Sequence, residues 1–241
     1  MELIYDYPVV VSLIVIIAIV YHVFKKHVNE KVKVMYETYK EVPTLTGLTG
    51  AEAARKLLDA NDLSQVKVEQ SGRGVLSDHY DSYAKAVRLS KNHFNRSSLI
   101  SITIAAHEVG HAIQDRDKNS SYRFQQKILS FIIFAIKFHV QTILITLGIG
   151  LILFAMFGLE RESAFMTPTF ISGGVLAVVG LILPILDFVF PIATLKVESD
   201  ASYRAINQMK RLKMICNAEE EQRVKEILDV IRLTYVIAVF E

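Results

Sequence analysis

The sequence predicts a predominantly α-helical membrane protein, with three transmembrane helices and a cytoplasmic α+β region. Three long apolar stretches are almost free of charged residues, and a polar segment separates the first stretch from the other two. The polar segment alternates between strand-like and helix-like hydrophobic spacing. Four regions are therefore predicted: an N-terminal transmembrane anchor (1–24), a cytoplasmic region (25–127), a transmembrane hairpin (128–195) and a C-terminal helical region (196–241).

The first apolar stretch, Pro8 to Phe24, contains no Asp, Glu, Lys or Arg. At ~1.5 Å per helical residue it is just long enough to reach across ~30 Å of hydrocarbon. Acidic residues precede it and lysines follow it, whereas a secretory signal peptide begins with basic residues and ends at a cleavage site. This charge bias predicts an uncleaved anchor whose N-terminus lies outside the cell and whose following loop is cytoplasmic.

The other two stretches predict a membrane hairpin. Residues 140–159 are uncharged, and residues 170–195 contain a single charge, Asp187. Basic residues on both sides of the pair indicate that its two ends are cytoplasmic. Residues 128–139 are apolar but contain Lys137 and His139, so they either lengthen the second span or lie along the membrane surface. Buried core helices of a soluble protein are the alternative for all three stretches, and their lack of charge disfavours it.

Composition excludes some classes of protein. The net charge of +2 gives no reason to expect nucleic acid as a partner. Cys216 is the one cysteine in the sequence, so an internal disulfide is excluded. This fits a reducing compartment, or a fold that needs no disulfide.

The polar segment predicts a short helix, a small antiparallel sheet and a second helix. Thr49 followed by Glu52 is a capping box and marks the first helix start. Residues 66–70 and 86–90 alternate like half-buried strands, and 75–82 is a possible third strand. The second helix covers 95–117 and is capped by Asn95 or Ser97. Hydrophobic spacing predicts a last helix from 218 onward, whose end (230–241) packs against the hairpin or lies at the membrane interface.

The second helix contains the sequence HEVGH. His107 and His111 are four residues apart, so they share one helix face and can bind one tetrahedral metal ion. Glu108 is rotated about 100° from His107 and can hold a metal-bound water and act as general base without being a ligand. Gly110, between the histidines, would allow another element to approach closely. Short motifs of this kind also occur by chance, and the alternative is a polar stripe on an ordinary helix.

A catalytic zinc needs a third protein ligand, and the residues directly after the motif contain no further histidine. "LKVESDASYRA", after the last apolar stretch, offers Glu198 and Asp200. If this segment is helical, Glu198 could reach the metal, while Asp200 faces elsewhere and could orient a histidine by accepting its free N–H. His139 is the other candidate, although an interfacial histidine is the better interpretation there.

Four segments resemble the YugP-like neutral zinc metallopeptidases of bacterial membranes: "GLTGAEAARKLLDAN", "LSDHYDSYAKAVRLS", "AAHEVGHAIQD" and "KVESDASYRA". The resemblance implies a zincin-like catalytic region with one Zn²⁺ per chain, held by His107, His111 and Glu198, with Glu108 as catalytic base. The chain departs from the family at Ser199, where a Phe is usual, but this position should face away from the metal. In the "SDHYD" stretch, His79 or Tyr80 could stabilise the oxyanion, or could serve only the turn and the sheet edge.

These observations predict a multi-pass protein of the cell membrane that hydrolyses peptide bonds as a zinc metallopeptidase. Its catalytic region is expected on the cytoplasmic side, with peptides or membrane proteins as substrates and the lipid bilayer as a partner. Two alternatives remain open. One is an intramembrane zinc protease, with the HEVGH helix inside the bilayer. The other is a non-catalytic membrane scaffold in which a fourth protein ligand, such as His79, closes the zinc site.

Overall fold

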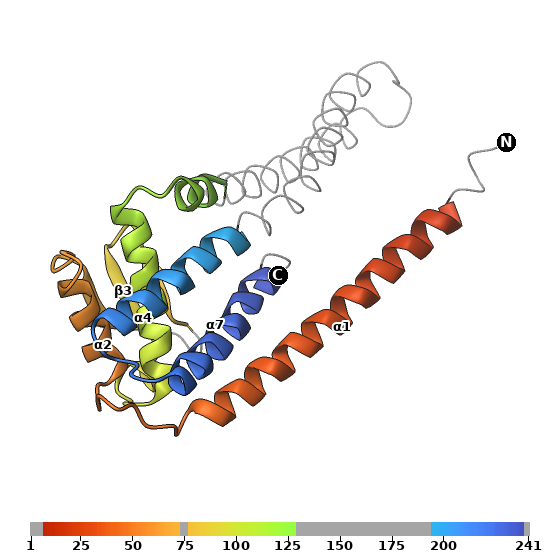
Figure 1. The fold of residues 1–241 in the computed structure, drawn as a ribbon. Helices are drawn as coiled ribbons and strands as arrows, with labels where there is room; N and C mark the ends of the chain where they lie inside the picture. Colours follow the sequence, from red (N-terminus) through yellow and green to blue (C-terminus); the bar gives the residue numbers. More distant parts are fainter. Residues whose placement is uncertain (1–6, 73–76, 129–193, 239–241) are drawn as a thin grey trace, which may run out of the picture. The chain divides into compact units, whose positions relative to one another are not determined.

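The computed structural model describes residues 7–72, 77–128 and 194–238. The chain divides into two compact units, Met1–Asn119 with Leu195–Glu241, and Ser120–Thr194. Figure 1 shows the elements of the first unit, which run in this order: α1 (Tyr7–Tyr39), α2 (Gly50–Asp59), β1 (Lys67–Gln70), β2 (His79–Asp81), β3 (Ala86–Leu89), α3 (Lys91–Phe94), α4 (Leu99–Arg116), the helical segment 195–211, and α7 (Ala218–Ala238). In the second unit, residues 120–128 are helical.

The predicted membrane architecture is corrected by the structure. Among the described residues, no helix is both long and apolar enough to cross a membrane, so the prediction of three transmembrane helices is wrong. The predicted anchor is part of α1, which has 33 residues and continues through Lys25 and Lys26 to Tyr39. An uncharged run of 17 residues is only about 25 Å long as a helix, shorter than the ~30 Å hydrocarbon layer. The other two predicted spans lie almost wholly outside the described residues.

The small sheet is mixed, not antiparallel as predicted. Its strand order is β1-β3-β2, with β2 antiparallel to β3 and β1 parallel to β3. Alternating hydrophobicity identifies the buried face of a strand but not the direction in which its neighbour runs. The three predicted strands exist, and only the direction of β1 differs from the prediction.

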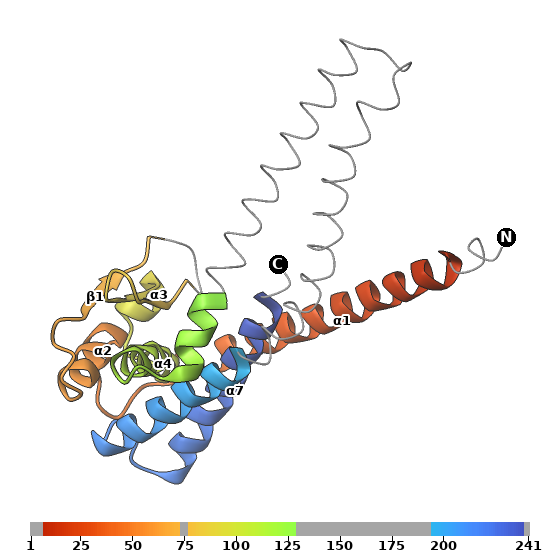
Figure 2. The ribbon, with the colours of Figure 1, turned by 90° about the horizontal axis from the view of Figure 1, so that it is seen from above.

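Helix α4 lies at the centre of the first unit. Every residue from Leu99 to Gln114 is buried. Figure 2 shows α2, α3 and the sheet on one side of α4, and the 195–211 helix with α7 on the other. A helix enclosed in this way must be apolar almost all round, and the few polar side chains that it buries must have partners. The helix begins after Ser98, not after Asn95 or Ser97 as predicted, because Lys91–Phe94 form the separate short helix α3.

The predicted capping box at the start of α2 is confirmed. The Glu52 amide donates to the Thr49 hydroxyl, and the Thr49 amide donates to the Glu52 carboxylate. The cap fixes where the helix begins, and therefore which face it turns to the core. Its buried side chains pack against α4: Ala53, Ala54, Leu57 and Leu58.

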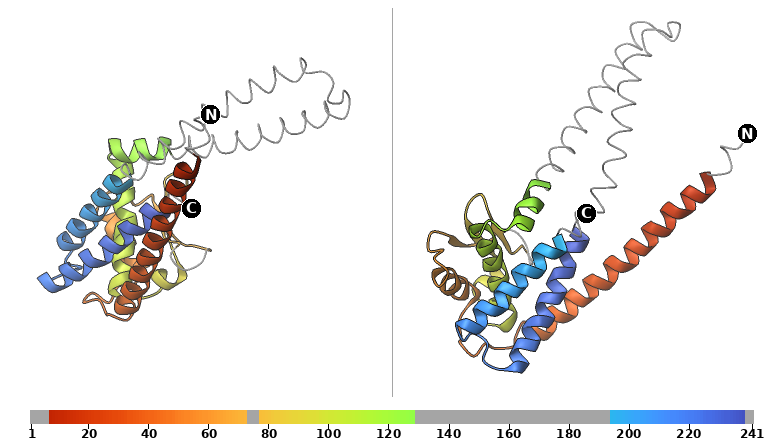
Figure 3. Two further views of the ribbon diagram at one scale, coloured as in Figure 1. Left: turned by 90° about the vertical axis from the view of Figure 1, so that its right-hand side faces the viewer. Right: turned by 45° about the horizontal axis from the view of Figure 1, so that its top comes forward.

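Helix α7 packs along the second half of α1 and against α4, as the helices drawn side by side in Figure 3 illustrate. Val224, Ile227 and Leu228 are buried in the core that surrounds α4. Val28 and Val32 of α1 form a smaller cluster with partly buried residues of α7. The end of this helix, 230–241, was predicted to pack against the membrane hairpin or to lie at the membrane interface. The hairpin lies almost wholly outside the described residues, so this stays a prediction. In the described part of the chain, α7 completes the protein core.

Candidate metal site

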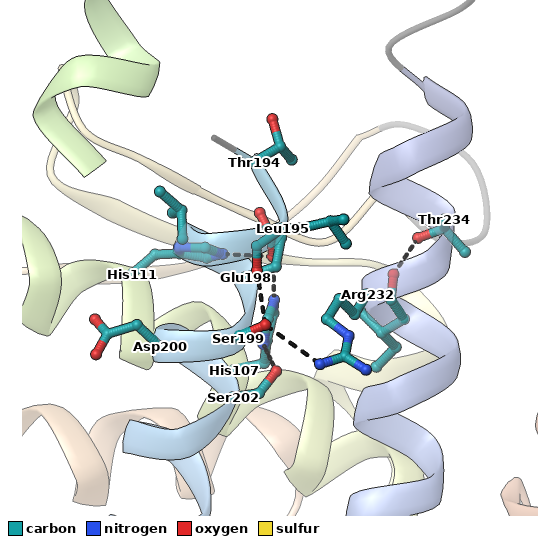
Figure 4. Close-up of polar contacts among 12 residues, drawn as sticks. His107, His111, Thr194, Leu195, Glu198, Ser199, Asp200, Ser202, Arg232 and Thr234 are labelled. Carbon is teal, nitrogen blue, oxygen red and sulfur yellow. Dashed lines mark hydrogen bonds and ion pairs between the residues drawn. The ribbon is translucent and has the colours of Figure 1, made fainter. Parts of the chain in front are cut away.

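The two histidines of HEVGH lie one turn apart on α4. Their ring centroids are 4.8 Å apart and the rings are nearly perpendicular, at 82°. His107 is fully buried and His111 is 7% exposed. Because α4 is enclosed by protein, both imidazoles face another element of the fold. That element is the 195–211 helix, as Figure 4 shows.

Glu198 from that helix reaches both histidines. Its Oε2 atom lies 3.0 Å from Nε2 of His107 and 3.3 Å from Nε2 of His111. The predicted helical continuation after the last apolar stretch is therefore confirmed, and it brings together residues 91 positions apart in the chain. Figure 4 shows the three side chains converging on one point.

The three donor atoms have a spacing that suits a small metal ion. They all lie within 4.8 Å of one another. In a tetrahedral zinc site with bonds of ~2.0–2.2 Å, neighbouring donor atoms are about 3.4 Å apart. Two imidazole nitrogens and one carboxylate form a common donor set for zinc. Among the described residues these three form the group that could hold a metal, and His79 is not a member of it.

His111 and Glu198 shift each other's pKa in opposite directions. Burial disfavours the protonated His111, but the Glu198 carboxylate outweighs this and raises the pKa of His111 to about 9. Burial also disfavours the ionised Glu198, yet His111 and His107 lower the pKa of Glu198 to about 2. A buried carboxylate therefore stays ionised where a cation would be bound.

Glu108 is buried beside these residues and is 2% exposed. Burial raises the pKa of its carboxyl group, His107 and His111 lower it, and the carboxylates of Asp78 and Glu198 raise it further. The net shift is upward, which makes Glu108 a stronger base than an exposed glutamate.

Each histidine contacts a second polar group through its other ring nitrogen. Nδ1 of His107 lies 3.3 Å from the Ser202 hydroxyl, and Nδ1 of His111 lies 3.0 Å from the Gln114 side-chain oxygen. Asp200 was predicted to accept directly from a histidine. It accepts instead from the Gln114 amide, at 2.8 Å. One signal for this role is the spacing, because Gln114 is three residues after His111 and so lies on the same helix face.

Gly110 lets the two helices approach each other closely, as predicted. A Cβ atom at this position would lie 2.5 Å from the Ala201 carbonyl oxygen. No real side chain tolerates such a contact without backbone movement. Glycine therefore sets the distance between the helix that carries the histidines and the helix that carries Glu198.

Other predicted candidates lie in less central positions. Nδ1 of His79 donates to the Ser77 carbonyl, and the Tyr80 hydroxyl donates to Asp115. Ser199 faces away from the three-residue group, as predicted, and contacts Arg232 of α7 (Figure 4). His139 lies outside the described residues.

Asp78 and His93 form a buried pair that was not predicted from the sequence. Their side chains meet at 2.8 Å, and the Ser90 amide donates to the other Asp78 oxygen. His93 is 1% exposed, and its Nε2 atom has no hydrogen-bond partner among the residues that the structure describes. The pair connects the "SDHYD" stretch to α3. Since neither residue stands in a spaced motif, the sequence carried no signal for it.

The comparison with known proteins agrees with this arrangement. A family model described as "Putative neutral zinc metallopeptidase" matches residues 12–241. The chain belongs to this family. It is also 36% identical over 208 residues to a protein of Bacillus subtilis (strain 168) named "Putative membrane protease YugP", covering 86% of this chain and 82% of that protein. No solved structure matches the chain. The predicted resemblance is thus confirmed.

Proposed function

We propose that this chain is a zinc metallopeptidase that hydrolyses peptide bonds at the site formed by His107, His111 and Glu198. One observation carries the proposal. Three buried donor atoms converge with spacing suited to zinc, while Glu108 lies beside them and outside the donor group. Three protein ligands and a separate carboxylate are the requirements of a catalytic zinc site, which keeps a coordination position for water or substrate.

The roles of the residues follow from this geometry. Zinc, when bound, lowers the pKa of water and polarises a carbonyl group. The proposed ligands are Nε2 of His107, Nε2 of His111 and the Glu198 carboxylate, with one ion per chain. Glu108 takes the proton of the attacking water and then delivers it to the leaving amine. Burial favours this function, because it raises the pKa of Glu108 toward the range in which a carboxyl group both accepts and returns a proton.

Two observations disfavour the alternatives. A closed structural site would need a fourth ligand, and the described residues add no further His, Cys, Asp or Glu to the group. An intramembrane protease would expose its motif helix to lipid, whereas α4 is surrounded by α2, the sheet and α7 within a protein core.

The test is to purify the chain and its Glu108→Gln variant and to measure bound zinc and hydrolysis of casein. We expect about one zinc per chain in both proteins and a loss of hydrolysis of at least 100-fold in the variant, the usual size of a general-base effect. Glu41→Gln is the matched control, because Glu41 is an exposed carboxylate with 76% of its side chain accessible. Equal cleavage by wild type and Glu108→Gln would refute the mechanism.

We further propose that the protein acts in contact with a membrane, on membrane proteins or peptides. The relative in Bacillus subtilis is named a membrane protease. On α1 of this chain, exposed apolar side chains follow helical spacing at Ile16, Ile19, Val20 and Val23, and two lysines come directly after Phe24. An apolar helix face next to basic residues binds the interface of an anionic bilayer.

Flotation with anionic vesicles tests this association. Ile19→Asp combined with Val23→Asp should release the chain from the vesicles. Val34→Asp is the control, because Val34 is 63% exposed on the same helix but lies C-terminal to the apolar run, beyond Lys25 and Lys26. We also propose that the catalytic region is cytoplasmic, because the lysines after the apolar run favour binding to the anionic cytoplasmic leaflet. Protease digestion of intact cells and of inverted vesicles checks this: fragments from intact cells that include residues 77–128 would contradict it.

A further inference from the structure

Gln114 connects the two halves of the candidate metal site. It is fully buried on α4, and its side chain contacts both His111 and the helix that carries Glu198. We propose that Gln114 is a positioning residue, which fixes the ring orientation and tautomer of His111 and ties both to the docking of the 195–211 helix. This inference rests on the proposed zinc function and adds a residue to it.

The partners of the Gln114 amide determine its orientation. Its Nε2 group donates to the Val197 carbonyl at 2.9 Å and to the Asp200 carboxylate at 2.8 Å. A carbonyl and an ionised carboxylate are acceptors only. If the amide were rotated by 180°, its oxygen would face two other oxygens in a buried place. The side-chain oxygen must therefore face His111.

This orientation selects one form of the His111 ring. The Gln114 oxygen can only accept, so Nδ1 of His111 must carry the hydrogen across the 3.0 Å contact. In the neutral ring, Nε2 is then the nitrogen with a free lone pair, and this is the atom 3.3 Å from Glu198. His107 lacks such a constraint from its neighbour Ser202, because a hydroxyl can donate or accept.

Asp200 is itself held firmly. Its Oδ2 atom accepts from Arg204 at 2.8 Å and from Asn119 at 3.2 Å, in addition to Gln114. Arg204 also reaches Asp117, just after the end of α4. The Gln114 amide is therefore fixed by the same helix turn that presents Glu198. If this helix moves away from α4, the metal site loses Glu198, and at the same time Gln114 loses the partners that orient it toward His111.

The test measures zinc affinity of the purified chain by competition with a chromogenic chelator. Gln114→Met keeps the length and helix propensity of the side chain but removes its hydrogen bonds. We expect zinc affinity to fall about 10–100-fold, the usual effect of losing a group that orients a metal ligand. Thr103→Val is the matched control, since Thr103 is equally buried on α4 and, within the described part of the chain, its hydroxyl bonds only to the Leu99 carbonyl. The zinc affinity of the Thr103→Val variant should equal that of wild type.

A second pair of variants separates positioning from packing. Gln114→Glu can still accept from His111 but opposes the Asp200 carboxylate, so zinc affinity should fall. Adding Asp200→Asn restores a donor facing the new carboxylate and should recover at least tenfold of the lost affinity. A residue that served only to fill space would show no such rescue.

The outcomes distinguish the two proposals. If the wild-type chain binds no zinc, the proposed function fails. If wild type binds zinc and Gln114→Met binds it within twofold as tightly, the role of Gln114 fails and the proposed function stands. If Gln114→Met does not fold, the rescue decides: no recovery in Gln114→Glu with Asp200→Asn would overturn the inference.

Discussion

Gly110 and Ala201 lie in direct backbone contact between the helix that carries the histidines and the helix that carries Glu198. A Cβ on Gly110 would also lie 3.1 Å from Ala201 Cα. Gly110→Ala should therefore push the helices apart and lower the free energy of unfolding by about 1–3 kcal/mol, a typical cost of overpacking. This loss exceeds the gain of up to ~1 kcal/mol expected from replacing a helical glycine by alanine. Urea unfolding measures it.

Zinc affinity of the same variant should fall as well, because Glu198 lies one helical turn before Ala201. Gly72→Ala is the control: a Cβ on Gly72 would meet no atom within 4 Å. If Gly110→Ala is as stable as Gly72→Ala and binds zinc equally well, close approach at Gly110 does not set the geometry of the site.

The Asp78 and His93 pair should contribute to stability. Asp78→Ala removes the acceptor for the Ser90 amide and a partner of the buried His93 ring. Leaving buried polar groups without partners costs about 1–3 kcal/mol. Thermal unfolding of Asp78→Ala and of the control Asp59→Ala checks this, since Asp59 is 53% exposed and lies at the end of α2. Equal midpoints for the two variants would contradict the prediction.

Local patterns in the sequence were sufficient for much of the candidate site. The spacing of His107 and His111 put both rings on one helix face, and Gly110 indicated a close neighbour. Glu198 followed from the need for a third ligand and from the family resemblance. The shared face of the two histidines and the place of Gly110 between them rest on helical periodicity, which depends only on nearby residues. The ligand roles themselves, and the four predicted regions, remain predictions.

Features that depend on distant contacts could not be predicted in the same way. Alternation identified β1 and β3 but not their parallel pairing, because strand direction is decided by the path of the chain between them. Asp200 was assigned to a histidine directly, since helical spacing places Gln114 beside His111 but does not show that Asp200, 86 residues away, contacts Gln114. The apolar run in α1 was interpreted from its lack of charge, its length and the charges on either side, and its length as a helix was judged too generously.

The capping box of α2 gives a prediction that tests local folding. Thr49→Ala removes the hydroxyl that accepts from the Glu52 amide at 3.2 Å. Loss of an N-cap costs typically ~1 kcal/mol. Thr49→Ser is the matched control, because serine caps equally well. Urea unfolding should separate the two variants by about this amount, and indistinguishable curves would show that the cap does not stabilise the fold.

Glu221 of α7 should make the free energy of unfolding depend on pH in the acid range. Its carboxylate pairs with Lys210 and Lys225, both at 2.8 Å, and these contacts lower the pKa of Glu221 to about 2 from an ordinary value of 4.5. A carboxyl group whose pKa is lower in the folded chain stabilises the fold fully above pH 4.5 and loses this contribution as the pH falls toward 2.

The unfolding midpoints of wild type and Glu221→Gln, measured from pH 7 to pH 2, test this. Wild type should be the more stable at neutral pH, and the difference should shrink below pH 4.5 and vanish near pH 2. Because Glu221 and its two lysine partners lie at the surface, 1 M salt should reduce the difference in stability between wild type and Glu221→Gln at pH 7. Glu219→Gln is the control, since Glu219 is 74% exposed and its one ion pair with a described residue is to Arg223. A difference that persists unchanged at pH 2 would mean that the Glu221 side chain stabilises the fold by packing and not by its charge.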